Sequence, residues 1–169
     1  MEQKEYVILD FSRMQDRASW QIINDGVMGG LSQSEMIFSE KGTAVFQGTL
    51  SLENNGGFAS TRTFPRPYHL GDYSGLILQI LGDGKNYQLR LRTDDRFDGI
   101  SYRYHFTTEP GSTKIIRASF NDFEPVFRGQ VVENAAPISP ADIQQIGFLI
   151  ANKQVGTFRL EVDWIKAVK

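Results

Sequence analysis

The chain has 169 residues, a length typical of one domain with a self-sufficient hydrophobic core. It has no cysteine, which excludes disulfides, thiolate nucleophiles and cysteine-bound zinc, and two histidines are too few for a histidine-rich metal cluster. A formal net charge of −2 provides no basic field for nucleic acid. We therefore predict a single domain over residues 1–169, with no metal, no cofactor and no nucleic-acid partner.

The first residues predict neither a signal peptide nor a membrane segment. The apolar run at 7–11 is short and is interrupted by charge, and the start of the chain lacks the arginine-rich, acid-poor composition of a transit peptide. We therefore expect a soluble, cytoplasmic protein that does not insert into a membrane.

The stretch 20–34 is the first candidate site. An apolar run led by Trp20 ends at the turn residues 24–26, and Val27 and Met28 then precede two glycines. Turn residues on both sides of an apolar pair predict an exposed tip that could press against a partner. The alternative is an irregular loop packed under the domain's own core.

The sequence pattern predicts an all-β jelly-roll sandwich with very little helix, because short β-rich runs alternate with glycine, asparagine and aspartate turns. Residues 44–52 alternate and should place Phe46, Leu50 and Leu52 on the core face. Residues 76–81 are apolar on both faces except for Gln79, which is typical of a central strand.

Residues 87–93 and 101–106 are predicted to pair as a hairpin, each with an aromatic or aliphatic face and a cationic one. Arg90, Arg92, Arg103 and His105 would then share one sheet surface. Such a surface could meet a carboxylate, a phosphate or an acidic partner. It could equally be a solvated outer face that neighbouring carboxylates balance.

The last third of the chain continues the β pattern. The three phenylalanines of the loop 120–129 should pack against the body of the protein, and residues 137–143 predict one short helical turn. In the closing strand, 156–165, alternation predicts that Phe158, Leu160, Val162 and Trp164 all face the core.

Catalytic motifs are weak. The sequence has no nucleophile elbow, zinc-protease motif or phosphate loop, and neither His69 nor His105 has a readable triad partner, so both are interpreted as structural. Asp94, Asp95 and Asp98 could hold Ca²⁺, but their spacing does not match an EF-hand, and we expect no bound ion there.

The chain resembles the complex I intermediate-associated protein family along nearly its whole length. The motifs that carry the resemblance are Trp20, residues 24–32, 46–48, 52–60, 82–87, 127–129 and 146–148, and the pair Trp164 and Ile165. Mitochondrial members are assembly factors for respiratory complex I, and their domain is similar to galactose-binding-like jelly rolls. The resemblance thus implies that fold and an assembly or binding role, and it implies no catalytic residues.

We therefore predict a non-catalytic protein-binding domain, whose partner is a protein such as an assembly intermediate of a membrane complex. The alternative is a carbohydrate- or small-ligand-binding module, which would need an exposed aromatic platform. Most aromatic residues fall on the inward side of the strands, which favours the protein partner. The candidate binding residues are Asn24, Asp25, Val27, Met28, Gly29, Gly30, Asn54, Asn55, Gly57, Arg90, Arg92 and Arg128.

Overall fold

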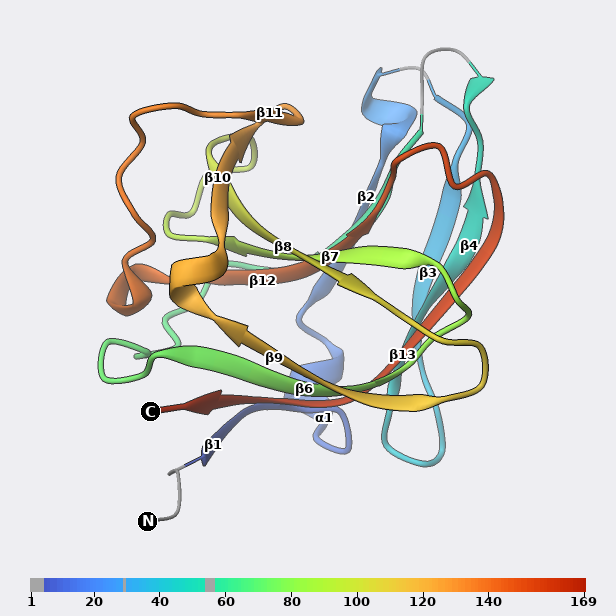
Figure 1. Ribbon diagram of the computed structural model, residues 1–169. Helices are drawn as coiled ribbons and strands as arrows, with labels where there is room; N and C mark the ends of the chain where they lie inside the picture. Colours follow the sequence, from blue (N-terminus) through green and yellow to red (C-terminus); the bar gives the residue numbers. More distant parts are fainter. Residues whose placement is uncertain (1–4, 29, 54–56) are drawn as a thin grey trace.

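Two β-sheets lie face to face and form a sandwich (Figure 1). The computed structural model describes residues 5–28, 30–53 and 57–169. Neighbouring named strands run antiparallel in both sheets. The predicted all-β sandwich with very little helix is confirmed.

The first sheet has six strands, in the order β3-β4-β13-β6-β9, and β1 also pairs with β13. Its members are β1 (Glu5–Asp10), β3 (Gln33–Phe38), β4 (Ala44–Leu50), β6 (Gly75–Leu81), β9 (Thr113–Ser119) and β13 (Gly156–Val168). The long strand β13 organises this sheet, because β6 pairs along one side of it while β4 and then β1 pair along the other.

The second sheet has seven strands, in the order β11-β10-β8-β7-β12-β5-β2. Its members are β2 (Trp20–Asn24), β5 (Ala59–Thr63), β7 (Asn86–Arg92), β8 (Ser101–Thr107), β10 (Glu124–Phe127), β11 (Gln130–Val131) and β12 (Gln145–Ile150). The helical segments described are α1 (Met14–Arg17), η1 (Asp25–Met28), η3 (Phe120–Asp122) and η4 (Pro140–Asp142). The last of these confirms the helical turn predicted within 137–143.

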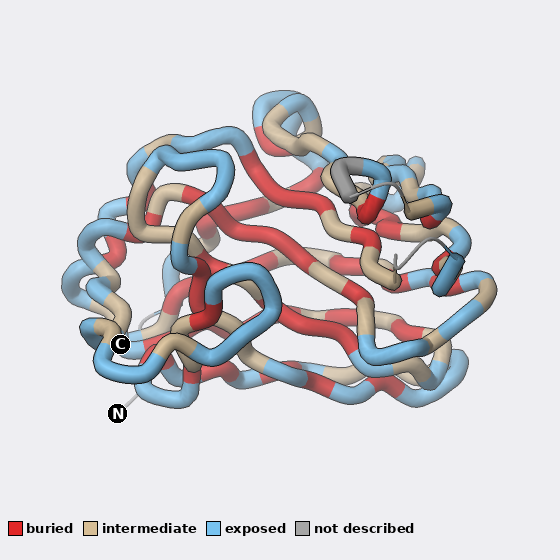
Figure 2. The backbone as a smooth tube through the Cα atoms, turned by 90° about the horizontal axis from the view of Figure 1, so that it is seen from above, coloured by how far each residue is buried: buried red, intermediate tan, exposed pale blue. Residues whose placement is uncertain are grey.

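The core fills the space between the sheets, and buried residues run along the middle of the strands (Figure 2). In β6, Leu76, Ile77, Leu78 and Ile80 are at most 3% exposed. Both faces of this strand are thus covered, and β13 and β9 flank it, as predicted for a central strand.

The predicted alternation of inward and outward residues in β13 does not hold at the end of the strand. A β-bulge lies between Val162 and Trp164, and beyond it Ile165 and Ala167 are fully buried. Trp164 is only partly buried, and the ammonium group of Lys166 lies 4.1 Å from the centre of its ring. The prediction that Trp164 faces the core was wrong, because the extra residue of a bulge reverses the inward and outward positions.

Strand β4 also ends earlier than the pattern suggested. Phe46 and Leu50 are buried as predicted, but Leu52 lies beyond the strand and is 41% exposed. The alternation of residues 44–52 was therefore misleading in its last two positions, where the chain has already left the sheet.

Two of the three phenylalanines in the loop 120–129 pack inward as predicted. Phe120 and Phe123 are buried, and their ring centres are 6.2 Å apart. Phe127 departs from the prediction, since it is 38% exposed on β10.

Candidate functional site

The outer face of the seven-stranded sheet carries most of the predicted cationic residues. Strand β7 buries Tyr87, Leu89 and Leu91 against the other sheet, so Arg90 and Arg92 point outward. Strands β7 and β8 pair directly, which confirms the predicted hairpin. We call this outer surface the arginine face, and the residues that define it are Arg62, Arg90, Arg92 and Arg103.

Strand register lines up three of these arginines across the sheet. Gly147 of β12 pairs with Arg62 of β5 on one side and with Arg90 of β7 on the other. Arg90 in turn pairs with Arg103 of β8, and Arg103 pairs with Glu124 of β10. These five residues form the arginine row, in which three cations share one carboxylate.

The hydrogen bonds of three arginines go to neutral oxygens. Arg62 Nη2 donates to the Phe97 carbonyl at 2.6 Å, and Arg92 Nη1 donates to the Gly99 carbonyl at 3.1 Å. Arg90 donates from Nε to the amide oxygen of Gln88 at 2.8 Å and from Nη1 to the Ser101 hydroxyl at 2.9 Å. These bonds orient the guanidinium groups without neutralising them.

Only Arg103 of the arginine face has an ion pair within the described part of the chain. Its Nε lies 2.8 Å from Glu124 Oε1, and His105 Nε2 lies 3.9 Å from the same oxygen. Burial, together with the charge of Arg103, lowers the pKa of His105, so this imidazole is largely neutral at pH 7. It adds little charge to the face.

Burial and repulsion between neighbouring arginines lower the pKa values of Arg62 and Arg90. Burial, together with the nearby charge of Arg92, lowers the pKa of Arg62 to about 10. Burial and the charges of Arg92 and Arg103 likewise lower the pKa of Arg90 to about 10. A group with such a pKa is still protonated at pH 7, so the face keeps its positive charge.

A loop from β7 to β8 borders the arginine face. Gln145 Nε2 donates to the carbonyls of Asp94 and Arg96 at 2.9 and 3.2 Å, which ties this loop to β12. Asp98 pairs with Arg128 at 3.0 Å, and both side chains are more than half exposed. Arg128, a predicted binding residue, thus lies at the border of the face and outside the arginine row.

The other border contains the loops around η1 (Figure 1). Asp25 is fully buried, and its carboxylate accepts hydrogen bonds from the backbone N–H groups of Ser32, Gly57 and Phe58 at 2.9, 2.7 and 3.3 Å. The Ser32 hydroxyl donates a further bond to it at 2.5 Å. Asp25 therefore joins the loop that follows β2 to the loop that precedes β5.

Those hydrogen bonds decide the ionisation of Asp25. Burial alone would raise the pKa of its carboxyl group, but the bonds from Ser32, Gly57 and Phe58 outweigh burial and hold the pKa below its ordinary value. The carboxylate is ionised, and the donors that bind it are Ser32, Gly57 and Phe58 of the same chain. Its observed contacts are therefore internal to the loops.

Asn24, Gly30 and Gly57 belong to the same loop connection. Asn24 Oδ1 accepts hydrogen bonds from the Ser34 hydroxyl at 2.7 Å and from the Ser60 N–H at 3.3 Å. The Gly30 N–H donates to the Asp25 carbonyl at 2.8 Å. Gly57 has a φ of +137°, a conformation that favours glycine. These predicted residues hold the loops in shape.

Three of the remaining predicted loop residues, Gly29, Asn54 and Asn55, lie outside the described residues. Val27 and Met28 are described only as backbone positions of η1. Their role as a contact tip stays a prediction.

Sequence reasoning missed Arg62 and the α1 region. The signal for Arg62 was the alternation of 59–63, in which Ala59 and Thr63 are fully buried.

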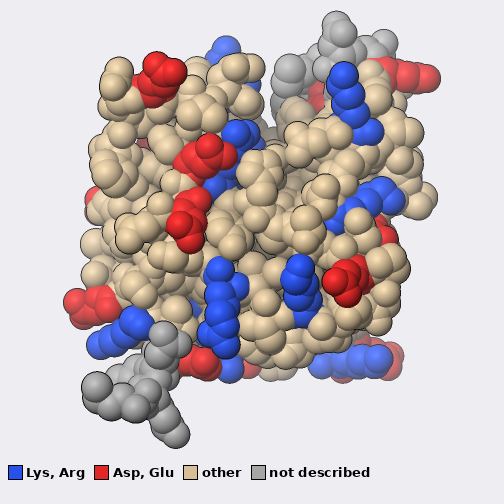
Figure 3. Space-filling model, viewed as in Figure 1, with Lys and Arg blue, Asp and Glu red and all other residues tan. Residues whose placement is uncertain are grey.

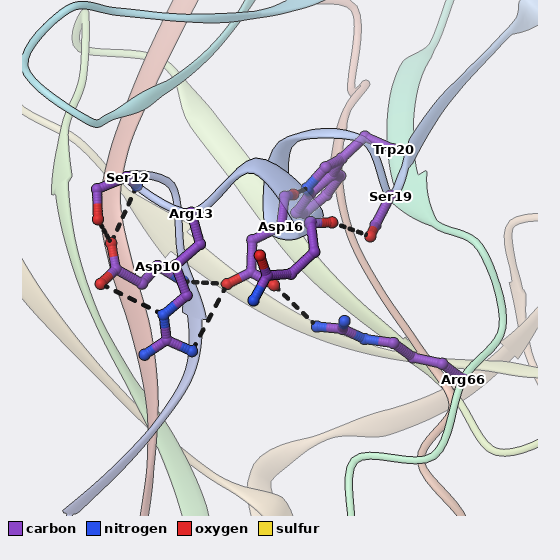
Figure 4. Close-up of polar contacts among 8 residues, drawn as sticks. Asp10, Ser12, Arg13, Asp16, Ser19, Trp20 and Arg66 are labelled. Carbon is purple, nitrogen blue, oxygen red and sulfur yellow. Dashed lines mark hydrogen bonds and ion pairs between the residues drawn. The ribbon is translucent and has the colours of Figure 1, made fainter.

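Around α1, Figure 4 shows Asp16 between Arg13 and Arg66. Asp16 is 2% exposed as a residue, and its carboxylate accepts the Asp10 N–H at 2.9 Å and lies 3.3 Å from Arg66 Nη2.

Metal binding finds no support among the residues that the structure describes. Asp94 accepts a hydrogen bond from the Arg96 N–H, and Asp98 pairs with Arg128. In the described ranges, no group of three or more histidine, cysteine or acidic side chains could hold a metal ion. Among the same residues, no helix is both long enough and apolar enough to cross a membrane.

Solved structures show which fold the sandwich has. It resembles the family 11 carbohydrate-binding module of a cellulosomal cellulase from Clostridium thermocellum, with a TM-score of 0.74 at 18% identity over 99% of this chain and 96% of that one. A family 29 carbohydrate-binding module is more distant, with a TM-score of 0.53 at 9% identity over 99% of this chain and 87% of that one. These likenesses confirm the jelly-roll fold of galactose-binding type.

Several curated proteins are similar to this chain in sequence. An uncharacterised protein of Schizosaccharomyces pombe is 29% identical over 86% of this chain and 76% of its own length. The mitochondrial complex I intermediate-associated protein 30 of Mus musculus is 28% identical over 98% of this chain, and that of Drosophila melanogaster is 26% identical over 94%. The matches span only 56% and 61% of those two relatives.

The family model named complex I intermediate-associated protein 30 matches residues 9–162, which include nearly every strand of both sheets. This match agrees with the resemblance of the motifs at 24–32 and 52–60, which meet at Asp25. The chain belongs to the complex I intermediate-associated protein 30 family.

Proposed function

We propose that this chain is a non-catalytic protein-binding domain that takes part in the assembly of respiratory complex I. Family membership supports the assembly role, since the named relatives are complex I intermediate-associated proteins. The arginine face and its two bordering loops supply the contact surface. The cytoplasmic location expected from the sequence stays a prediction, because those relatives are named as mitochondrial.

The observation that carries this proposal is the set of apolar side chains beside the arginine face. Phe97 is 59% exposed and Ile100 37% exposed in the β7–β8 loop, and Val131 is 49% exposed on β11. The ion pair between Asp98 and Arg128 links the two segments. Exposed apolar residues beside arginines are the composition of protein–protein interfaces.

A carbohydrate ligand has weaker support. A sugar-binding face usually offers exposed aromatic rings, whereas Tyr87, Tyr102 and Phe106 of this sheet are buried toward the core. Phe97 is exposed, but the Arg62 guanidinium lies 4.8 Å from the centre of its ring. Likeness to carbohydrate-binding modules at 18% identity concerns the fold alone.

The test is deletion of the chain's coding sequence in its own host. Native gel electrophoresis of the respiratory complexes should show less mature complex I and an accumulation of partial assemblies. Re-expression of the wild-type chain should restore the mature complex. A normal level of complex I in the deletion strain would contradict the proposal, and retention of the purified chain on β-glucan would favour the carbohydrate alternative.

A further inference from the structure

A groove lies between the two sheets where β8 and β9 diverge from the loop that joins them (Figure 1). Its volume is about 470 Å³, and its walls are residues 104–107 of β8 and 114–117 of β9. Among the described residues, Asn86 and Asn152 complete the lining, which contains no carboxylate. Ile115 is 41% exposed on this wall, so the groove is open to solvent.

Strand β9 has an unpaired edge along this groove. It is the end strand of its sheet, and β6 is its only partner among the described strands. The Phe120 N–H bonds the Ser74 carbonyl, so the even-numbered residues of β9 bond β6 and the odd-numbered ones direct their N–H and C=O groups to the open side. The Arg117 carbonyl accordingly accepts the Tyr104 hydroxyl across the groove at 3.2 Å. In the same part of the chain, the backbone of Ile115 has no partner on the open side.

The facing edge of β8 is also only partly paired. Strand β10 pairs with residues 101–103, and no other described strand pairs along that edge. Lys114 Nζ crosses the groove and donates to the Thr107 carbonyl at 3.1 Å. Unpaired strand edges bind extended chains, because such chains offer N–H and C=O groups at the matching spacing. The open edge of β9 thus fits an extended segment.

The side chains on this edge select the charge of that segment. Lys114 and Arg117 lie three positions apart on β9, and neither forms an ion pair within the described ranges. Figure 3, in the orientation of Figure 1, shows basic side chains over this strand. Two copies paired through β9 would place the cations of both on one short ladder, and their repulsion disfavours that pairing. An acidic segment of a different chain would neutralise them.

We propose that the open edge of β9 binds an extended acidic segment of the protein partner by strand addition, with backbone hydrogen bonds to Ile115 and carboxylates beside Lys114 and Arg117. The backbone bonds supply affinity, and the two carboxylates supply selectivity. Because β9 belongs to the six-stranded sheet, this edge is a second contact, separate from the arginine face. The inference rests on the proposed function for the existence of a protein partner.

The test uses the full chain and three synthetic peptides of seven residues. The first peptide has glutamate at its third and sixth positions and threonine or valine elsewhere. The second has lysine in place of both glutamates. The third keeps the glutamates but carries a methyl group on every amide nitrogen, which removes its N–H donors. The first peptide should bind about tenfold more tightly than either of the others, because each of them lacks one of the two recognition elements.

Hydrogen exchange measured by NMR locates the contact. The N–H groups of Ile115 and Arg117 should exchange about tenfold more slowly with the first peptide bound, because new hydrogen bonds protect them. The N–H groups of β3, at the other end of the same sheet, should exchange at unchanged rates.

Two pairs of variants separate charge from backbone. Arg117→Gln should weaken binding of the first peptide about fivefold, whereas Arg159→Gln, which removes a charge from β13 of the same sheet, should change it less than about twofold. Ile115→Pro removes the open N–H group and should abolish binding, whereas Ile115→Thr keeps that group and should bind like wild type. The thermal midpoint shows whether each variant is folded. The three-peptide comparison on wild type decides the matter even if Ile115→Pro does not fold.

Equal binding of the first and second peptides, or of the first and third, would overturn the inference, as would a first peptide that does not bind. Self-association of the chain that Ile115→Pro abolishes would also overturn it, in favour of a second copy on this edge. If the first peptide fails while the deletion strain still loses complex I, strand addition at β9 is wrong and the assembly role stands. If it binds while complex I is normal, the β9 site stands and the assembly role is wrong.

Discussion

The backbone N–H of Gly57 donates a 2.7 Å hydrogen bond to the carboxylate of Asp25, across 32 positions of sequence. With the bonds from Ser32 and Phe58, it makes one buried side chain the connection between the loops after β2 and before β5. These loops border the arginine face opposite β10 and β11 (Figure 1). The shape of that border therefore depends on a single carboxylate.

Replacing Asp25 with asparagine should lower the free energy of unfolding by about 1–3 kcal/mol, because an amide would turn an NH₂ group toward backbone donors and leave some of them unsatisfied. Urea denaturation monitored by fluorescence measures the change. Asp95→Asn is the matched control, since it makes the same substitution in the exposed β7–β8 loop, and it should stay within about 0.5 kcal/mol of wild type. Equal stability of Asp25→Asn and wild type would contradict the role of Asp25.

Asp25 also predicts a dependence of stability on pH. Its pKa in the folded protein lies below its ordinary value, so its contribution is complete above the unfolded pKa of about 3.9 and is lost as pH falls through the folded value. The stability difference between wild type and Asp25→Asn should be constant from pH 7 to 5 and should shrink below about pH 4. Asp10, whose pKa is also lowered, is present in both proteins and cancels in the difference.

Gly147→Ala should destabilise the seven-stranded sheet by about 1–3 kcal/mol, because the new methyl group overlaps the Thr61 carbonyl and the Arg62 side chain. Thermal unfolding measures this change. Gly26→Ala is the control, since a Cβ at that position meets no atom within 4 Å. If the two variants melt together, β5 and β12 are not packed as closely as the structure shows.

The sequence predicted the parts of the fold whose pattern is regular. The alternation in β7 and β8 correctly placed the tyrosines and leucines inward and Arg90 and Arg92 outward. Trp164 was misplaced because a bulge has no signature in the pattern of apolar residues. Leu52 was misplaced because alternation does not show where a strand ends.

The candidate site was harder to predict, since it depends on contacts between distant strands. Arg62 and Arg90 are 28 positions apart and are brought into one row only by the register of β12 between them. Asp25 was recognised as a special position, but its turn pattern could not distinguish a carboxylate that contacts a partner from one that binds its own chain. The difference lies in the Gly57 and Phe58 N–H groups, which only the fold brings near.

Arg128→Ala should leave the free energy of unfolding within about 1 kcal/mol of wild type, because its ion pair with Asp98 is exposed and such pairs contribute little. Chemical denaturation measures that value. When the free energy of unfolding is unchanged, a loss of partner capture by this variant reports a direct contact at the border of the arginine face. Unchanged capture removes Arg128 from the candidate binding residues.

Met28→Ser tests the tip predicted from the turn residues on both sides of Val27 and Met28. If this tip contacts the partner, the thermal midpoint should stay within a few degrees of wild type while capture of complex I assembly intermediates from host membranes is lost. If Met28 instead packs within the domain, the variant should lose about 1–3 kcal/mol of stability, and capture should fall only as far as folding does.

Gly30→Ala separates damage to the loop from loss of a contact. A Cβ at Gly30 would lie 2.4 Å from Asp25 Cγ, so this variant should disturb the loop connection and lower the thermal midpoint and the capture together. Met28→Ser should lower the capture alone. A Met28→Ser protein that melts far below wild type, or that captures the intermediates undiminished, would show that the tip is not the contact and would leave the arginine face as the binding surface.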